Sequence, residues 1–240
     1  MEIKIEADTL GHLYSLPITN ALWVSFLVSF ILIVVAWKVR KNWQEVPTGK
    51  LQFFIEFLLE GAENFMDSIV QNRKLTRRLF PFIMTMFLFF LVSNLLAIIP
   101  GILAIKFNGI HFFRPPTTDY NAVLVISGVT FLLMQITAFT SGGPLKYFKK
   151  YINYSSPINF LVSLIEALGD VARVVAMSFR LFGNMVAEEV LTAVVVALIP
   201  FIVPIPFSLL GLIIAVVQPA VFAILSLIFI KLSIIEEHGH

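Results

Sequence analysis

Six charged side chains lie within one long apolar stretch of the sequence, from Ile158 to Ile199. They are Glu166, Asp170, Arg173, Arg180, Glu188 and Glu189. Carboxyl groups exchange protons with water, whereas an arginine guanidinium keeps its charge in proteins. A fixed cation and several acids in apolar surroundings are suited to moving ions, and we interpret this stretch as an ion path.

Helical geometry places most of these groups on one face. At about 100° per residue, four of the charged residues and Asn184 fall within about 80° of Arg180. The remaining one, Glu189, falls about 180° from Arg180. The stretch therefore predicts a narrow polar stripe, with one carboxylate on the opposite side that faces different surroundings.

Two interpretations of the stripe remain open. Asp170 and Arg173 are spaced i, i+3, and Glu166 and Asp170 are spaced i, i+4, so these groups could simply neutralise one another in a helix bundle. Arg180 differs, because the nearest acid on its stripe is Glu188, two turns away. A guanidinium in a membrane without a nearby acid indicates a functional site.

The elements that position these groups belong to a membrane protein. Of the 240 residues, 58% are hydrophobic and 13% are charged, and the mean hydropathy is +0.91. Soluble domains carry about 25% charged residues, and so few charges could not cover so much apolar surface. The composition excludes a disordered chain and a basic nucleic-acid-binding domain. The chain has no cysteine, which excludes disulfides and thiolate chemistry.

Five apolar segments are long enough to cross a bilayer, which takes about 20 residues. They run from Ile18 to Trp37, Leu79 to Ile99, Ala122 to Thr140, Ile158 to Ile199 and Ile205 to Ile235. We therefore predict an all-α integral membrane protein with a single membrane domain over residues 1–240 and an outer segment at 1–17. The fourth segment would be roughly 60 Å long, against roughly 30 Å of hydrocarbon. Residues 158–235 are thus expected to form a hairpin of strongly tilted helices.

Basic residues are distributed unequally between the two sides of the membrane. The loops after the first and third expected spans, which lie on one side, hold eleven basic residues. The opposite side holds only Lys4, Lys106 and Arg114. Those eleven are Lys38, Arg40, Lys41, Lys50, Arg73, Lys74, Arg77, Arg78, Lys146, Lys149 and Lys150. Because basic loops favour the cytoplasm, we expect the N-terminus outside and the C-terminus inside.

The segment from Leu51 to Val70 is too polar to span the membrane. Its apolar residues fall near one face, and they are Phe54, Phe57, Leu58, Phe65 and Ile69. Its acidic residues recur at spacings of three and four, and they are Glu56, Glu60, Glu63 and Asp67. This pattern predicts an amphipathic helix at the inner surface. Such a helix could pack on the membrane domain or offer a docking surface to a partner.

The residues around Arg180 resemble a known family signature. The run SFRLFGNMVAEEV, from Ser178 to Val190, is similar to the signature of subunit a of F-type ATP synthases, with a Glu nine residues after the Arg. The segments SNLLAIIP, PPTTDYN and VVQPAVFAILSLIFI and the tail EEHGH are also similar to parts of that family. The resemblance covers most of the chain from about Leu79 onward.

The resemblance implies a stator subunit that is not itself catalytic. In this family, two aqueous half-channels carry protons to and from the carboxyl of a ring of c subunits, and the flow drives ring rotation and ATP synthesis. The family's essential Arg corresponds to Arg180, which would separate the half-channels. Asn184, Glu189 and Gln218 correspond to outer polar positions, and Glu166 to an acidic position on the cytoplasmic side.

The resemblance also implies the surroundings of the chain. Its partners would be the c ring, the b subunits of the peripheral stalk, the rest of the ATP synthase and the lipid bilayer, but no nucleic acid. The location would be the inner membrane of a bacterium. We expect no metal and no cofactor, and the choice between proton and sodium ion depends on the ring carboxyl.

Two positions depart from the family's pattern. The family often has a His on the last helix about two turns before its Gln, and here that position is Gly211. A carboxylate sometimes found at the end of the second span is replaced by Ala97. The proton path is therefore expected to use Glu188 beside Glu189, or waters, and we expect Glu189 to matter more. Asp170 completes the set of candidate path residues.

Two other classes of function were weighed against this one. A stand-alone ion-coupled transporter typically carries matching broken helices in two repeats, and the sequence has no such repeat. An intramembrane enzyme needs catalytic groups within the spans. The four histidines lie outside the expected spans, at His12, His111, His238 and His240.

Overall fold

Helices form almost all of the described chain. The computed structural model describes residues 9–13, 16–41, 43–44, 49–99, 102, 105–107, 110–142, 157–199 and 204–238. Its long helices are α1 (Asn20–Lys41), α2 (Lys50–Val70), α3 (Arg73–Ile98), α4 (Tyr120–Gly142), α6 (Pro157–Leu198) and α7 (Pro204–His238). The predicted all-α class is confirmed, and five of these helices, all except α2, are long and apolar enough to cross a membrane.

The helix ends differ from the predicted spans where charged residues continue the helix. The α3 helix begins at Arg73 rather than Leu79, so its basic residues lie in the first turns instead of in a loop. The α1 helix continues to Lys41 and carries Lys38, Arg40 and Lys41 in its last turn. Cations at a helix C-terminus interact favourably with its dipole, which accounts for the longer α1.

Short strands, which the sequence analysis missed, precede α1 and follow α3. Strands β1 (Thr9–Leu13) and β2 (Leu16–Thr19) pair antiparallel, as do β3 (Lys106–Phe107) and β4 (Ile110–His111). Strands this short leave little alternation of apolar and polar residues to detect. Part of the predicted outer segment (1–8), the basic residues Lys146, Lys149 and Lys150, and positions 200–203 of the hairpin turn lie outside the described residues.

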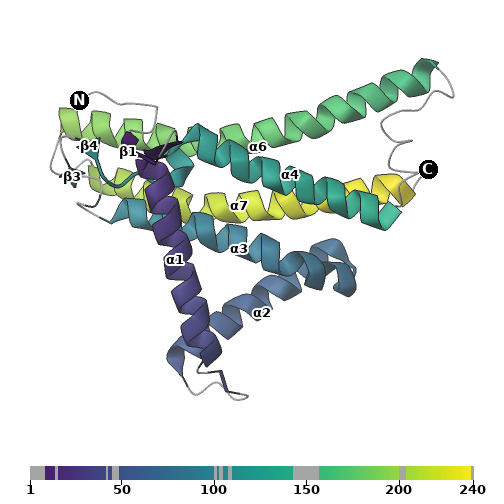
Figure 1. Ribbon diagram of the computed structural model, residues 1–240, viewed down its shortest axis with the longest axis horizontal. Coiled ribbons are helices and arrows are strands. Elements are labelled where there is room, and N and C mark those ends of the chain that lie inside the picture. The colour runs from purple at the N-terminus through teal and green to yellow at the C-terminus, as the bar shows by residue number, and fades with distance from the viewer. Residues whose placement is uncertain are drawn as a thin grey trace.

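The membrane domain is a group of lengthwise helices crossed by α1. Figure 1 shows α3, α4, α6 and α7 running alongside one another, with α1 crossing them steeply and α2 folding back beneath α3. The α7 helix contacts α2, α3, α4 and α6. It therefore forms the centre against which the other helices pack.

Two clusters of buried apolar residues surround α7. One joins α2, α3 and α4 to the second half of α7 and includes Leu227 and Ile230. The other joins α3, α4, α6 and α7 around Phe90, Leu181 and Phe222. The rings of Phe90 and Phe222 meet edge to face, with centroids 5.0 Å apart, a favourable geometry for aromatic pairs. The second cluster fixes the packed face of α6.

The α2 helix packs on the protein through its acidic side. Asp67 accepts a hydrogen bond of 3.1 Å from the hydroxyl of Thr76 in α3, and Glu63 lies 3.5 Å from the guanidinium of Arg77. The ammonium of Lys231 in α7 donates a 2.6 Å hydrogen bond to the carbonyl of Ile69. Of the two interpretations for this helix, these contacts favour packing on the membrane domain.

The exposed side of α2, away from α3 and α7, carries aromatic residues. Phe53, Phe54, Phe57 and Phe65 are exposed, whereas Met66 and Val70 are buried. The residues that the pattern grouped as one apolar face are therefore divided, because the exposed phenylalanines lie beside the face that packs on α3 and α7. An exposed aromatic row at the end of a membrane domain is suited to lipid.

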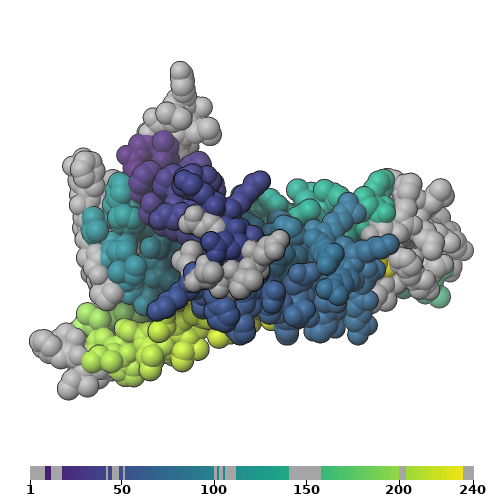
Figure 2. Space-filling view, turned by 90° about the horizontal axis from the view of Figure 1, so that it is seen from below, coloured from purple at the N-terminus to yellow at the C-terminus, as the bar shows by residue number. Residues whose placement is uncertain are grey.

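The first half of α7 lies at one edge of the molecule. Figure 2 shows this segment, coloured yellow-green, along one border of the molecule. Its large apolar side chains are open, among them Leu209, Leu210, Ile213 and Val217. The hairpin thus presents a broad apolar surface that the described part of the chain leaves uncovered.

Candidate functional site

The α6 helix has a packed face and an open face, and Arg180 lies where the two meet. Met177 and Leu181 are buried against the core, whereas Leu168 and Phe179 are more than half exposed. Arg180 follows Phe179 directly and is exposed. It makes no hydrogen bond or ion pair to any residue that the structure describes. An arginine without a partner beside open apolar surface is positioned to meet a charge on another molecule.

One helical turn beyond Arg180, a direct hydrogen bond joins the two helices of the hairpin. The Asn184 amide donates to the side-chain carbonyl of Gln218 at 2.9 Å. Gln218 is buried, and Asn184 is on the open side. The structure therefore brings together two of the sequence-predicted residues, and their remaining donors and acceptors are available to water or to a carboxyl.

A hollow opens between α6 and α7 directly beyond this hydrogen bond. Its volume is about 150 Å³, and its wall includes both polar and apolar side chains: Asn184, Ala187, Glu188, Leu191, Thr192, Phe207, Leu210, Gly211 and Ile214. A space of this size holds several water molecules. The hollow is therefore large enough to hold water beside the Glu188 carboxylate.

Gly211 creates the space that Glu188 occupies. A Cβ added at Gly211 would collide with the Glu188 carboxylate, whose Oε1 takes up that position. The departure from the family's pattern at Gly211 thus has a local reason, because a side chain on α7 would displace the acid on α6. The sequence indicated that Glu188 and Gly211 were unusual but gave no sign that they touch.

Glu189 lies apart from this group. Its side chain is exposed and does not line the hollow, and it bonds to no residue in the described ranges. Helical geometry separates it from Glu188 by about 100°. The structure therefore brings Glu188, Asn184, Gln218 and Gly211 together. It leaves Glu189 on the opposite side of α6 from Arg180.

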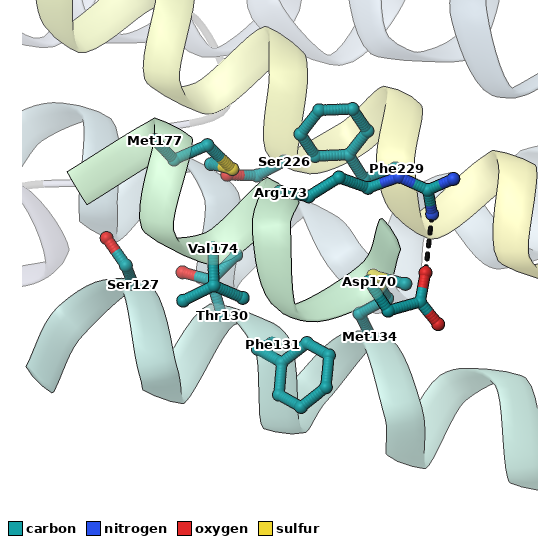
Figure 3. Close-up of a pocket in the computed structure, with 10 residues that line it drawn as sticks. All are labelled: Ser127, Thr130, Phe131, Met134, Asp170, Arg173, Val174, Met177, Ser226 and Phe229. Carbon is teal, nitrogen blue, oxygen red and sulfur yellow. Dashed lines mark hydrogen bonds and ion pairs between the residues drawn. The ribbon is translucent and has the colours of Figure 1, made fainter. Parts of the chain in front are cut away.

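Nearer the start of α6, Asp170 and Arg173 form an ion pair of 2.6 Å. Asp170 is 2% exposed and Arg173 is partly open. Figure 3 shows the Arg173 side chain beside α7, where its guanidinium lies 5.6 Å from the centre of the Phe229 ring. The neutralising pair that the spacing allows is thus present, and a cation–π contact extends it to α7.

A pocket next to this ion pair is lined by a buried hydroxyl that sequence patterns did not reveal. The hydroxyl of Ser127 in α4 is buried and has no partner among the described residues. The pocket lies between α4, α6 and α7 and is lined by Thr130, Asp170 and Ser226 among others. Glu166, one turn before Asp170, is partly buried and does not join the ion pair.

Two further polar residues were missed because their partners are distant in the sequence. Asn94 in α3 is 1% exposed and bonds to both α7 and the loop before α4. Thr117, in the short 3-10 helix η1 (Pro116–Thr118), is fully buried. An amide within the apolar run of α3 was a detectable signal, because a polar group inside a membrane needs a partner.

Across the described ranges, His, Asp and Glu form no group of three or more that could hold a metal ion.

Comparison with known proteins agrees with this geometry. The family model described as ATP synthase A chain matches residues 21–231. The chain is 32% identical over 222 residues to a protein of Geotalea daltonii named ATP synthase subunit a, covering 91% of this chain and 89% of that protein. A Geobacter sulfurreducens protein of the same name is 33% identical over 221 residues, with the same coverage.

A third relative, from Citrifermentans bemidjiense and also named ATP synthase subunit a, is 33% identical over 223 residues, with 92% of this chain and 89% of that protein covered. The match spans the five candidate membrane helices and the whole polar group on α6 and α7. This multi-pass membrane protein therefore belongs to the ATP synthase A chain family.

Proposed function

We propose that this chain is the stator half of the proton-driven motor of an F-type ATP synthase. As a member of its family, it is a component of the membrane sector and assembles with the rest of an ATP synthase. In our proposal, it conducts protons through two half-channels to and from a carboxyl on a ring of c subunits. The chain itself carries out no bond-breaking chemistry, and ion flow past it turns the ring.

The position of Arg180 carries the proposal. Its guanidinium is exposed at the border of an open apolar surface and has no partner in the described part of the chain. A ring carboxyl is neutral while it faces lipid and is stabilised as an anion beside a fixed cation. At 4 Å and an effective dielectric constant of about 20, that attraction is about 4 kcal/mol.

The polar groups beyond Arg180 supply the outer half-channel. The hollow against Glu188 and Gly211 is large enough for water, and the Asn184–Gln218 hydrogen bond lies between that hollow and Arg180. A proton arriving in the hollow thus reaches a carboxylate and then a pair of amides. Amides orient water without adding charge, so they suit the last step before a ring carboxyl.

The inner half-channel is assigned to the start of α6. Glu166, Asp170 and the pocket beneath Arg173 lie on the other side of Arg180 along the helix. Because Arg180 separates the two groups and keeps its proton, it prevents protons from passing directly between the half-channels.

The crossing of α1 and α7 supports a strong tilt of the hairpin. Figure 1 shows α1 running steeply across the direction of α7, so the two helices cannot both follow the membrane normal. The α1 helix has 22 residues, which makes it about 33 Å long and matches the hydrocarbon thickness of about 30 Å. If α1 stands upright, α6 and α7 run obliquely through the membrane and keep their open apolar faces toward the ring.

The experiment that tests this function replaces Arg180 in the assembled complex. We expect Arg180→Ala to abolish ATP-driven proton pumping in inverted membrane vesicles while protons leak passively through the complex, because no fixed cation then separates the half-channels. Arg180→Lys is the matched control: it keeps a charge but loses the planar guanidinium, so pumping should fall without a comparable leak. Normal pumping by Arg180→Ala would overturn the proposal.

A further inference from the structure

The α7 helix contains a proline next to the residue that bonds Asn184. Pro219 lies inside α7 and follows Gln218 directly. Proline has no backbone N–H, so it leaves the carbonyl four residues earlier without its helical donor. That carbonyl belongs to Ala215, which is buried. A bare carbonyl at membrane depth costs several kcal/mol unless another group donates to it.

Asn94 in α3 supplies the missing donor. Its side-chain amide donates a hydrogen bond of 3.2 Å to the carbonyl oxygen of Ala215. Asn94 is 1% exposed, so water does not compete for the bond. Pro219 and Asn94 are therefore complementary: one removes a donor from α7, and the other restores it from a different helix.

The outer loop fixes the orientation of this amide. The hydroxyl of Thr117 donates to the side-chain oxygen of Asn94 at 2.8 Å. Arg114 holds the loop by donating to the hydroxyl and the carbonyl of Thr118, both at 3.2 Å. Since a backbone carbonyl only accepts hydrogen bonds, the amide nitrogen of Asn94 must point to Ala215 and its oxygen to Thr117.

We propose that Asn94 is a positioning residue for the proton path. By bonding the carbonyl that Pro219 leaves bare, it fixes the backbone of α7 beside Gln218 and so holds the Gln218 side chain against Asn184. Ala215 and Gln218 are separated by one helical turn, and the Gln218–Asn184 bond lies one turn from Arg180. The importance given to Gln218 rests on the proposed function. The hydrogen bond from Asn94 to Ala215 does not depend on that proposal.

The test is a double-mutant cycle between Asn94 and Pro219 in the assembled complex. Asn94→Leu leaves the Ala215 carbonyl unpaired, and we expect ATP-driven proton pumping to fall about tenfold. Pro219→Ala restores the helical N–H, so Asn94 is no longer needed by that carbonyl. Adding Asn94→Leu to Pro219→Ala should therefore lower pumping less than twofold. An equal loss in both backgrounds would overturn the proposal.

Matched controls separate this effect from general damage to the packing. Ser93→Ala changes the neighbouring buried residue, whose hydroxyl has no partner among the described residues, and should leave pumping unchanged in both backgrounds. Thr117→Val removes the group that orients Asn94, and its defect should also be relieved by Pro219→Ala. If Asn94→Leu prevents assembly, Pro219→Ala should restore assembly, and failure to do so counts equally against the proposal.

Hydrogen exchange distinguishes failure of this inference from failure of the proposed function. Asn94→Leu should increase deuterium uptake in the peptide around Ala215 to Phe222, and Gln218→Leu should not. If Gln218→Leu leaves proton flow normal, the role proposed for Gln218 is wrong even when the exchange result holds. Unchanged uptake in Asn94→Leu would show that Asn94 does not hold the backbone of α7 at Pro219.

Discussion

At the scale of single residues, Arg180 and Glu188 differ in what surrounds them. Arg180 is exposed beside an open apolar surface, whereas Glu188 is partly buried beside a hollow between two helices of its own chain. A guanidinium stabilises a carboxylate that passes by, while an acid in contact with water takes up and releases protons. The two residues thus suit successive steps of one path.

The hollow changes the expected order of the two neighbouring acids. From the sequence, Glu189 was expected to matter more, but Glu188 is the acid that lines the hollow. We now expect Glu188→Gln to slow passive proton flow on the order of tenfold and Glu189→Gln to slow it less. Proton flux into vesicles that hold the complex measures both. A larger loss for Glu189→Gln would return the role to that acid.

Gly211→Ala tests whether the Glu188 carboxylate must stay in its present position. The added Cβ collides with the carboxylate, so the acid is displaced from the hollow and proton flow should fall severalfold. Gly169→Ala is the matched control in α6, because nothing lies near the Cβ that it would add. The prediction fails if the two alanine variants conduct protons equally in the same vesicle assay.

At the scale of elements, the helix ends are held by charges as well as by packing. The Lys231 ammonium bonds the Ile69 carbonyl near the end of α2, where a helix leaves carbonyls without donors. This bond joins α2 to α7 across the base of the membrane domain. The cation also lies favourably for the dipole of α2.

Lys231→Met should loosen the end of α2 without unfolding the domain. Loss of a hydrogen bond to a charged group costs about 1.5–3 kcal/mol, so deuterium uptake should rise in the peptide around Phe65 to Gln71. Lys50→Met, at the exposed start of α2, is the control and should change exchange only locally. Identical uptake in Lys231→Met and the unmodified complex would contradict a capping role.

The sequence predicted the long elements well because their signals are local. Apolar runs and flanking charges placed the spans within a few residues, and the spacing of Asp170 and Arg173 allowed their ion pair. The bonds of Asn94 to Ala215 and Thr117 were not predictable in this way. They depend on how α3, α7 and the outer loop meet, which no spacing within one segment reveals.

At the scale of the whole molecule, the described helices form a scaffold with one side left open. The α3 and α4 helices cover the packed faces of α6 and α7, while large apolar side chains of the hairpin remain uncovered, among them Ile165, Leu168, Leu209 and Ile213. Such a surface belongs in lipid or against a partner of similar character. The proposed ring is a partner of that kind.

The proposed orientation, with the N-terminus outside, rests on the basic residues at the ends of α1 and α3 and is open to direct test. The natural chain has no cysteine, so single cysteines report their own exposure. We expect a cysteine at Gly11 to react with a membrane-impermeant maleimide in intact cells, and a cysteine at His238 to react only in inverted vesicles. The opposite pattern would reverse the proposed orientation.

The open position of Arg180 also affects the life of the chain before assembly. A guanidinium facing lipid costs at least about 2.5–3.5 kcal/mol, and the described part of this chain provides no acid to offset it. In the proposed function, a newly inserted copy bears that cost until the proposed ring covers Arg180. The residue proposed to act in the finished motor would then also destabilise the unassembled subunit, which favours its capture by the complex.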